Sequence, residues 1–335
     1  MMDPRRLKRS SPQSEFRWTG FATALTGLFL VLAACSGLDP TPEPDPIDPN
    51  SPCGTGPAVF NAFPTGFGPV GTDTTLEIAT WNIQNFPKAG TGTIDRVVEI
   101  VNTLRIDLYG LEEIEDTTQY RVLLNRLPDH AGVYSPDVYG FGNYQKTGFL
   151  YNKSVLTMNY RRVPPEFLGN SFAFPRPPLE ADFTARGNGH EYHFRAIVMH
   201  LKAGKDNADD QARRVAATTI LNNYLEARAL AEPGIDYVLL GDWNDVLTDT
   251  PMELNTFRDF LADPSNFLFL SKSLTSRSDM SSHPIGLIDH IMVNRSACPE
   301  FSAGRIGTLR LDLLVTGYTS FVSDHRPVVA VYRAF

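Results

Sequence analysis

Short segments of apolar, β-favouring residues recur along this chain, and six polar segments follow or begin such runs. Polar side chains at the ends of distant strands can converge on one pocket when those strands share a sheet edge. Carboxylates suit a hard divalent cation, while imidazoles and amides can bind a phosphate, so the pattern indicates metal-dependent phosphoester chemistry. The six segments are Trp81-Asn82, Glu112-Glu113, His200-Leu201, Gly241-Asp242-Trp243-Asn244, Ile288-Asp289-His290 and Ser323-Asp324-His325.

Between these segments, strand and helix patterns alternate. Residues 76–81 read as a buried strand, 179–186 and 191–200 as a hairpin, and 207–231 as a long helix. Further strands are expected at 106–111, 148–151, 157–163, 237–240, 287–293, 305–311 and 328–332, and further helices at 94–104, 120–127 and 252–261. The mixture of hairpins and helical crossovers predicts an α/β protein built as an α+β four-layer sandwich, in which two mixed β-sheets pack face to face and helices flank them.

The first 34 residues have the pattern of a targeting segment. A basic stretch precedes an apolar run at 21–34 that is too short for a comfortable transmembrane helix. Leu32-Ala33-Ala34-Cys35 resembles a bacterial lipobox, which implies cleavage before Cys35 and a lipid on that cysteine. Ser36 after it implies, in many diderm bacteria, export to the outer membrane or cell surface. An ordinary signal peptide or a membrane anchor is the alternative.

Residues 35–72 are expected to be a tether. Prolines alternate with polar residues between 40 and 52, and such a stretch cannot bury enough apolar surface to fold. Proline makes it an extended spacer of about 3 Å per residue. Residues 73–335 are long enough for one large core and are expected to form a single domain.

Charge and cysteine usage restrict the choice further. The net charge is −8, and residues 1–34 contribute five basic and two acidic groups, so the remainder is more acidic still. This argues against a broad basic face for duplex DNA but does not exclude a nuclease. With Cys35 lipidated, Cys53 and Cys298 remain as an even pair in an oxidising compartment, which predicts a disulfide between them.

The order and content of the six segments resemble the endonuclease/exonuclease/phosphatase superfamily, the deoxyribonuclease I-like fold, from Leu76 to the C-terminus. One Gly-Asp-x-Asn or Ser-Asp-His alone is a weak signal, whereas all six in this order are a strong one. The resemblance implies hydrolysis of a phosphodiester with Mg²⁺ as cofactor, with Mn²⁺ or Ca²⁺ as alternatives. Whether one ion or two bind is left open.

The resemblance assigns the metal-binding residues. Glu113 and Asp324 match the family's metal-side carboxylates, and Asn82 matches an amide that supports metal or phosphate. A carboxylate leaving a buried strand must be paired, hydrogen-bonded or bound to a cation, which agrees with this role for Glu113. Glu112 stands where the family more usually has Gln, and its charge either points elsewhere or tightens cation binding. Glu115 and Asp116 are expected to be surface acids.

The same resemblance assigns the catalytic residues. Asp242 aligns or deprotonates the attacking water, Asn244 holds phosphate oxygens, and Asp289 orients His325 and raises its pKa. His200 is the second imidazole. A buried, satisfied core histidine is the alternative for His200, and a structural strand-start aspartate the alternative for Asp289.

Four further positions have simpler interpretations. Arg176, in Phe174-Pro175-Arg176-Pro177-Pro178-Leu179, resembles the Arg-Pro-Pro segment of nuclease members and is expected to contact phosphate, or else to be a solvated loop arginine. His290 is expected to be a packing residue. Arg213 and Arg214 are expected to be helix-surface charges.

The sequence therefore favours an extracytoplasmic, lipid-anchored, monomeric nuclease of endonuclease type that acts on DNA or RNA. A lipid-head-group phosphodiesterase of sphingomyelinase type or an inositol-type phosphatase is the alternative. A surface binding protein without chemistry is a third hypothesis. The expected partners are nucleic acid, as the substrate, and the membrane, which the protein contacts through its N-terminal lipid anchor. No protein partner is expected.

Overall fold

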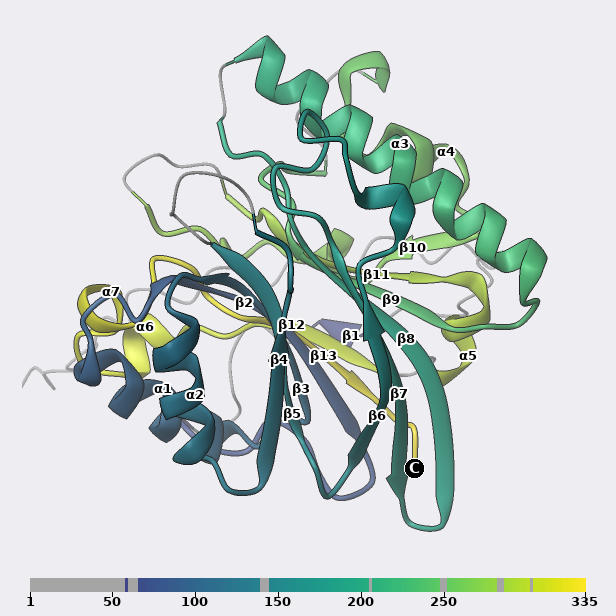
Figure 1. The fold of residues 1–335 in the computed structure, drawn as a ribbon. Helices are drawn as coiled ribbons and strands as arrows, with labels where there is room; N and C mark the ends of the chain where they lie inside the picture. The colour runs from purple at the N-terminus through teal and green to yellow at the C-terminus, as the bar shows by residue number, and fades with distance from the viewer. Residues whose placement is uncertain are drawn as a thin grey trace, which may run out of the picture. The chain divides into compact units, whose positions relative to one another are not determined.

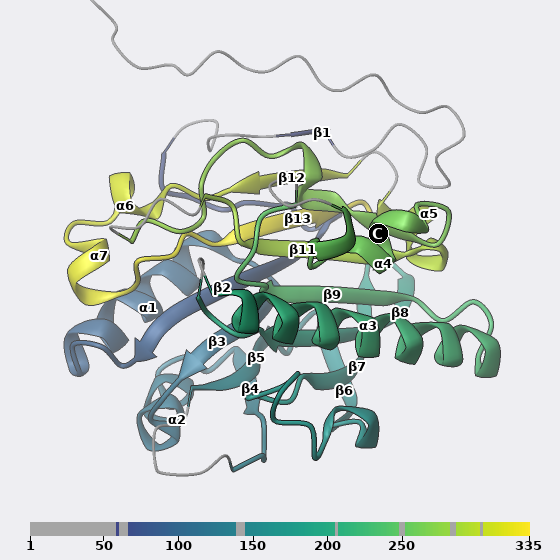
Figure 2. The same ribbon diagram turned by 90° about the horizontal axis from the view of Figure 1, so that it is seen from above.

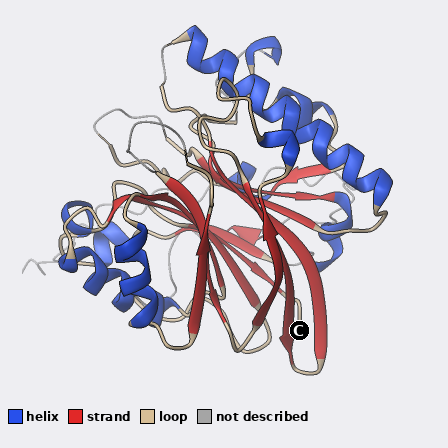
Figure 3. Ribbon diagram, viewed as in Figure 1, coloured by secondary structure: helices blue, strands red, loops and turns tan. Residues whose placement is uncertain are grey.

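The computed structural model describes residues 58–59, 66–138, 145–204, 207–247, 252–281, 286–301 and 304–335. Within them, two mixed β-sheets pack face to face and helices cover their outer faces, which confirms the predicted fold class (Figures 1 and 3). The first sheet has the strand order β1-β12-β13-β2-β3-β5-β4, and the second has the order β10-β11-β9-β8-β7-β6.

The bounds of the elements are as follows. The first sheet contains β1 (Ala58–Val59), β12 (Arg305–Thr308), β13 (Val328–Tyr332), β2 (Leu76–Phe86), β3 (Leu108–Ile114), β5 (Lys146–Asn152) and β4 (His130–Tyr134). The second contains β10 (Phe267–Phe269), β11 (Asp289–Asn294), β9 (Tyr237–Asp242), β8 (His190–His200), β7 (Leu179–Gly187) and β6 (Leu156–Arg162). The helices are α1 (Thr91–Leu104), α2 (Thr117–Asn125), α3 (Ala208–Ala231), α4 (Arg258–Ala262), α5 (Cys298–Phe301), α6 (Leu311–Leu314) and α7 (Tyr318–Phe321), with 3₁₀ turns η1 (Pro165–Phe167), η2 (Met252–Leu254), η3 (Leu270–Ser273) and η4 (Arg295–Ala297).

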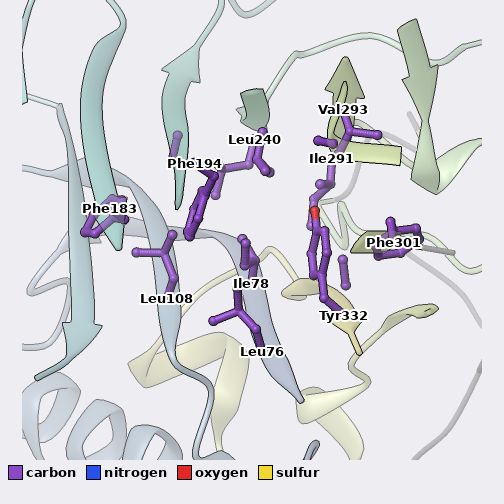
Figure 4. Close-up of a cluster of buried hydrophobic side chains, with 14 of the residues drawn as sticks. Leu76, Ile78, Leu108, Phe183, Phe194, Leu240, Ile291, Val293, Phe301 and Tyr332 are labelled. Carbon is purple, nitrogen blue, oxygen red and sulfur yellow. The ribbon is translucent and has the colours of Figure 1, made fainter. Parts of the chain in front are cut away.

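Three apolar clusters hold the four layers together. One lies between the sheets and contains side chains from both, such as Leu108 and Leu240 (Figure 4). A second joins the outer face of the first sheet to α1, α2, α6 and α7, and a third joins the outer face of the second sheet to α3 and α4 (Figure 2). A strand that is buried on both faces, such as β9, reads as a nearly continuous apolar run.

The two-residue alternation of the strands determines where the polar side chains lie. In β9, Val238 and Leu240 face the other sheet, and Asp242 is the next residue of the same row. In β8, Val198 likewise precedes His200 in the inward-facing row. The polar residues at these strand ends therefore lie on the same inward-facing side as the apolar residues of the inter-sheet core.

The register brings these strand ends side by side. Asp242 pairs with Asp289 across the β9–β11 ladder and with His200 across the β8–β9 ladder. In the first sheet, Asn82 pairs with Glu112 across the β2–β3 ladder. Residues from distant parts of the chain thus meet at one end of the sandwich.

Several expected boundaries differ from the structure. The strands expected at 106–111 and 237–240 extend to Ile114 and Asp242, so their polar residues lie within strands and not after them. The helix expected at 252–261 is split into η2 and α4. Strands β4 and β10 were not expected, because β4 is only half-buried and β10 is three residues long.

The prediction that Arg214 is a helix-surface charge is wrong. Its side chain is buried, and its Nη1 donates to the carbonyl oxygens of Lys202 and Gly204 at 3.0 and 2.7 Å. Its guanidinium also lies 3.4 Å from the Asp245 carboxylate. Arg214 therefore ties the loop after β8 to the loop after β9, which the helical pattern of α3 could not show.

Most N-terminal predictions concern residues outside the described ranges, but residues 58–59 and 66–72 of the expected tether are described. They belong in part to the domain, because β1 pairs with β12 and Val70 is buried in the cluster beneath α1. The signal segment, Cys35, the proline-rich stretch and Cys53 all lie outside the described ranges. Cys298 is disulfide-bonded, and its pairing with Cys53 stays a prediction. Among the residues that the structure describes, no helix is both long enough and apolar enough to cross a membrane.

The inter-sheet core generates a stability prediction. Leu240 is fully buried, and a Cβ placed on Gly110 of the facing sheet would lie 2.3 Å from a Leu240 methyl carbon, so the layers interlock tightly. We expect Leu240→Ala to lower the free energy of unfolding by about 2–5 kcal/mol in chemical denaturation. Leu230→Ala, at a position that is 84% exposed, should change it by less than about 0.5 kcal/mol. Equal losses in the two variants would contradict this view of the core.

Candidate active site

The buried amide of Asn82 lies at the centre of the candidate site. Its Nδ2 donates to Glu113 Oε1 and to Asp242 Oδ2, both at 3.1 Å. These two carboxylates come from different sheets, so one amide group bridges the mouth of the sandwich. The structure thus brings together three of the residues that the sequence predicted.

Glu113 reaches this site because the backbone departs from regular strand geometry. By strand alternation it would face the outer helices with Leu111, but its φ is 64° and the β3 register shifts on both sides at this point. Such a bulge changes the direction of a side chain. Its Oε2 also accepts the backbone N–H of Asn85 at 2.9 Å.

Left-handed backbone conformations cluster around the same point. Gln84, Asn85 and Asn244 have φ values of 37°, 49° and 54°. Non-glycine residues in this region are uncommon and cost energy, and they are typical of functional sites.

Asp242 is buried and surrounded by donors. Its Oδ1 accepts the N–H of Asn244 at 2.9 Å, and its Oδ2 lies 3.5 Å from His200 Nε2 and 3.9 Å from His325 Nε2. Burial and then the charge of Asp289 raise the pKa of Asp242 to about 7. A carboxylate with such a pKa can exchange a proton near neutral pH.

His325 forms a close pair with Asp289. The ring Nδ1 lies 2.8 Å from Asp289 Oδ2, which confirms the predicted contact. Burial alone would lower the pKa of His325, but the charges of Asp289, Asp242 and Asp324 raise it well above the ordinary value. These charges favour the imidazolium form of His325, and its Nε2 lies 3.9 Å from Asp242 Oδ2.

His200 has the opposite electrostatic environment. Its Nδ1 lies 2.6 Å from Nη1 of Arg176, and a guanidinium only donates, so Nδ1 accepts and Nε2 carries the ring proton. Burial, followed by the charges of Arg176 and His325, lowers the pKa of His200 well below the ordinary value. His200 is a neutral hydrogen-bond donor, and Arg176 contacts this ring.

Asp324 and Asn244 lie at the edge of this group. The Asp324 carboxylate is partly buried and accepts no hydrogen bond from any residue that the structure describes, which leaves its oxygens available for a ligand. Asn244 is half-buried, and its Nδ2 donates one hydrogen bond to the carbonyl of Leu201 at 3.2 Å, so its second N–H and its amide oxygen remain available.

Glu112 points into the space between the sheets, and its charge does not add to the site. Its Oε1 accepts Thr80 Oγ1 at 3.0 Å, and its other carboxylate oxygen has no partner among the described residues. Burial and the charges of Asp289 and Asp242 raise its pKa well above the ordinary value, so its surroundings favour the protonated acid.

His290 packs as predicted. Its ring lies edge-on to Phe257 and Phe269, and its nitrogens contact Ser271 Oγ at 2.9 Å and the Asp245 carbonyl at 3.0 Å.

Ser278 is a positioning residue that sequence reasoning missed. Its buried Oγ accepts the backbone N–H groups of Ile288 and Asp289 at 3.0 and 3.1 Å, which fixes the start of β11. A lone serine in a polar loop carries no sequence signal of this role.

The donor set fits a hard divalent cation. Glu113, Asp324 and Asn82 offer oxygen ligands, and Mg²⁺ prefers one or two carboxylates together with water and substrate oxygens. Asp242, Asp289 and His325 also place ligand atoms within 4.8 Å of one another. However, His325 Nδ1 is occupied by Asp289 and the ring is charged, so this second group is better suited to proton transfer.

The two imidazoles should differ when they are measured directly. In ¹⁵N NMR of the metal-free protein at pH 7.5, His325 should be doubly protonated and His200 protonated on Nε2 alone. Arg176→Met should raise the pKa of His200, because it removes a nearby positive charge. Arg213→Met, which removes an arginine that contacts the carbonyls of Phe172 and Ser171, should change neither ring. An ordinary pKa for both rings would contradict this assignment.

The chain was compared with curated proteins, solved structures and protein-family models. A search of curated proteins found no match. Among solved structures, an endonuclease/exonuclease/phosphatase family protein from Bacteroides thetaiotaomicron is similar with a TM-score of 0.55 and 16% identity, covering 77% of this chain and 97% of that one. The mannosyl-6-phosphatase of the same species gives 0.54 and 16%, covering 76% and 98%. D. rerio TDP2 complexed with a single-strand DNA product gives 0.51 and 14%, covering 77% and 99%.

These likenesses establish the fold, and a sequence comparison establishes the family. The sequence model of the Endonuclease/Exonuclease/phosphatase family matches residues 79–325, which include every candidate catalytic and metal residue. The chain belongs to the endonuclease/exonuclease/phosphatase family.

Proposed function

We propose that this protein is a metal-dependent phosphodiester hydrolase that acts on nucleic acid. Members of its family are phosphoesterase hydrolases that generally depend on a divalent metal. The observation that carries the proposal is the bridge from Asn82 to Glu113 and Asp242, with both imidazoles within 4.0 Å of Asp242. Carboxylates, amide and imidazoles of different protonation state are what in-line attack on a phosphate requires.

Each side chain then has a distinct task. Asp242 orients the attacking water and accepts its proton, since its pKa lies near neutrality. His325, charged by its pairing with Asp289, donates to the phosphate or protonates the leaving oxygen, and neutral His200 donates to a non-bridging oxygen. Glu113 and Asp324 would hold the cation, which when bound supplies positive charge to the phosphate.

Nucleic acid is the first candidate substrate for two reasons. The similar TDP2 structure is complexed with a single-strand DNA product, and Arg176 places a guanidinium beside His200 at the site. The acidic net charge favours brief local phosphate contacts over tight binding along a duplex.

A phosphatase that acts on a small phosphorylated alcohol is the second candidate. The similarity to a mannosyl-6-phosphatase supports it about as strongly as the similarity to TDP2 supports a nuclease. An inositol-type phosphate or a lipid head group belongs to the same chemical range.

The central test combines chelation with one isosteric variant. Asp242→Asn should lower kcat by about 10²–10⁴-fold because it removes the base, and EDTA should abolish turnover until Mg²⁺ or Mn²⁺ is restored. Plasmid DNA, RNA, sphingomyelin, sugar and inositol phosphates and bis-p-nitrophenyl phosphate form the substrate panel. Asp209→Asn, at an exposed position in the first turn of α3, is the matched control. Full hydrolysis by Asp242→Asn, or in EDTA, would contradict the mechanism.

We also propose that the protein is lipid-anchored on the outer side of a bacterial membrane. The basic stretch, the short apolar run and the lipobox-like Leu32-Ala33-Ala34-Cys35 support this localisation. In a diderm bacterial host, the full chain should incorporate labelled palmitate and fractionate with membranes, whereas Cys35→Ala should do neither. Cys298→Ala controls for the loss of a cysteine. Labelling of Cys35→Ala at the wild-type level would contradict lipidation at this residue.

A further inference from the structure

The loop that carries Asp324 and His325 is attached to the end of β2 by side chains that the proposed mechanism does not use. Ser323 Oγ donates to the carbonyl of Asn82 at 2.6 Å and accepts the N–H of His325 at 2.9 Å. This contact fixes the His325 side of the loop. Asp324 is held separately.

Gln84 makes the contact to Asp324. Its side-chain Oε1 accepts the backbone N–H of Asp324 at 3.1 Å. The Gln84 side chain is half-buried, and its backbone is left-handed with φ of 37°, so the residue turns back toward the loop.

Lys88 holds the same amide from the other side. Its Nζ donates to Gln84 Oε1 and, at 2.7 Å, to the carbonyl of Thr319 in α7. One ammonium group thus joins the end of β2 to the helix that leads into the Asp324 loop. Gln84 Oε1, with two donors, has its orientation fixed.

The backbone N–H of Gln84 makes a second contact, to the side chain of Asn82. Its N–H donates to Asn82 Oδ1 at 2.9 Å, which directs the Asn82 NH₂ group toward Glu113 and Asp242. Gln84 therefore contacts both Asn82 and Asp324, two of the three residues that offer oxygen ligands. Groups that orient metal ligands typically change metal affinity by about 10–100-fold when they are lost.

We propose that Gln84, held by Lys88, is a positioning residue that sets Asp324 for the divalent cation; this inference rests on the proposed function. The side chain does not touch the reacting phosphate. Its loss weakens the placement of the Asp324 oxygens and leaves the Ser323 contact to His325 intact.

Calorimetric titration of Mn²⁺ into the metal-free protein tests this role without any substrate. Gln84→Met keeps the length of the side chain but removes the acceptor, and should bind Mn²⁺ about 10–100-fold more weakly. Gln84→Glu keeps an acceptor oxygen for the Asp324 N–H and should bind at least as tightly as the wild type. Gln119→Met, a half-buried glutamine of α2 with no side-chain hydrogen bond to a described residue, is the matched control and should bind normally.

Activity provides a second readout. The Mn²⁺ concentration for half-maximal hydrolysis should rise in Gln84→Met by the same factor, while kcat at saturating Mn²⁺ stays within about threefold, because Asp242 and the His325 pair are untouched. Lys88→Met, at an exposed position, should move the Mn²⁺ affinity in the same direction by a smaller factor, and it keeps the test decisive if Gln84→Met unfolds.

Wild-type Mn²⁺ affinity in folded Gln84→Met, or equal weakening in Gln84→Glu, would overturn the positioning role even if EDTA abolishes hydrolysis. If the wild type hydrolyses no phosphoester and Gln84→Met still loses affinity for Mn²⁺, the proposed function fails and the positioning role stands.

Discussion

The packing of two sheets against each other is the constraint on which the site depends. Because strand side chains alternate between faces, the rows that build the inter-sheet core continue into Asp242, His200 and Asn82 at one end of the sandwich. The packing of the apolar side chains in each row fixes the position of the polar side chains at its end. The side chains that stabilise the fold therefore also determine the geometry of the site. Glu113 is the exception, since a bulge with positive φ brings it in from the opposite face.

Burial also determines which groups carry charge. Glu112, Asp242 and Asp289 are buried close to two imidazoles, and these groups cannot all be ionised. Their surroundings favour a neutral Glu112, a neutral His200 and a charged His325 beside Asp289. Two histidines that look equivalent in the sequence therefore have different chemistry. The difference comes from their second partners, a guanidinium for one ring and a carboxylate for the other.

Much of the fold and site could be predicted from the sequence, because apolar runs and strand-end polar residues are local patterns. The family match begins at residue 79, close to the predicted start of the likeness at Leu76, and β13 was predicted with its observed bounds. Properties that depend on tertiary surroundings were missed. Arg214 follows a helical pattern but is enclosed by two loops, the protonation of Glu112 follows from its burial, and the role of Ser278 depends on a loop that returns to β11.

The central claim is that these side chains gather around one divalent cation beside Asp242. A crystal structure of the wild-type protein soaked with Mn²⁺, with an anomalous difference map recorded at the manganese edge, tests it most directly. We expect a peak in contact with carboxylate oxygens of Glu113 and Asp324, while His325 keeps its contact with Asp289. A peak ligated by His325 and Asp289, or Glu113 and Asp324 left without any metal at saturating Mn²⁺, would contradict it.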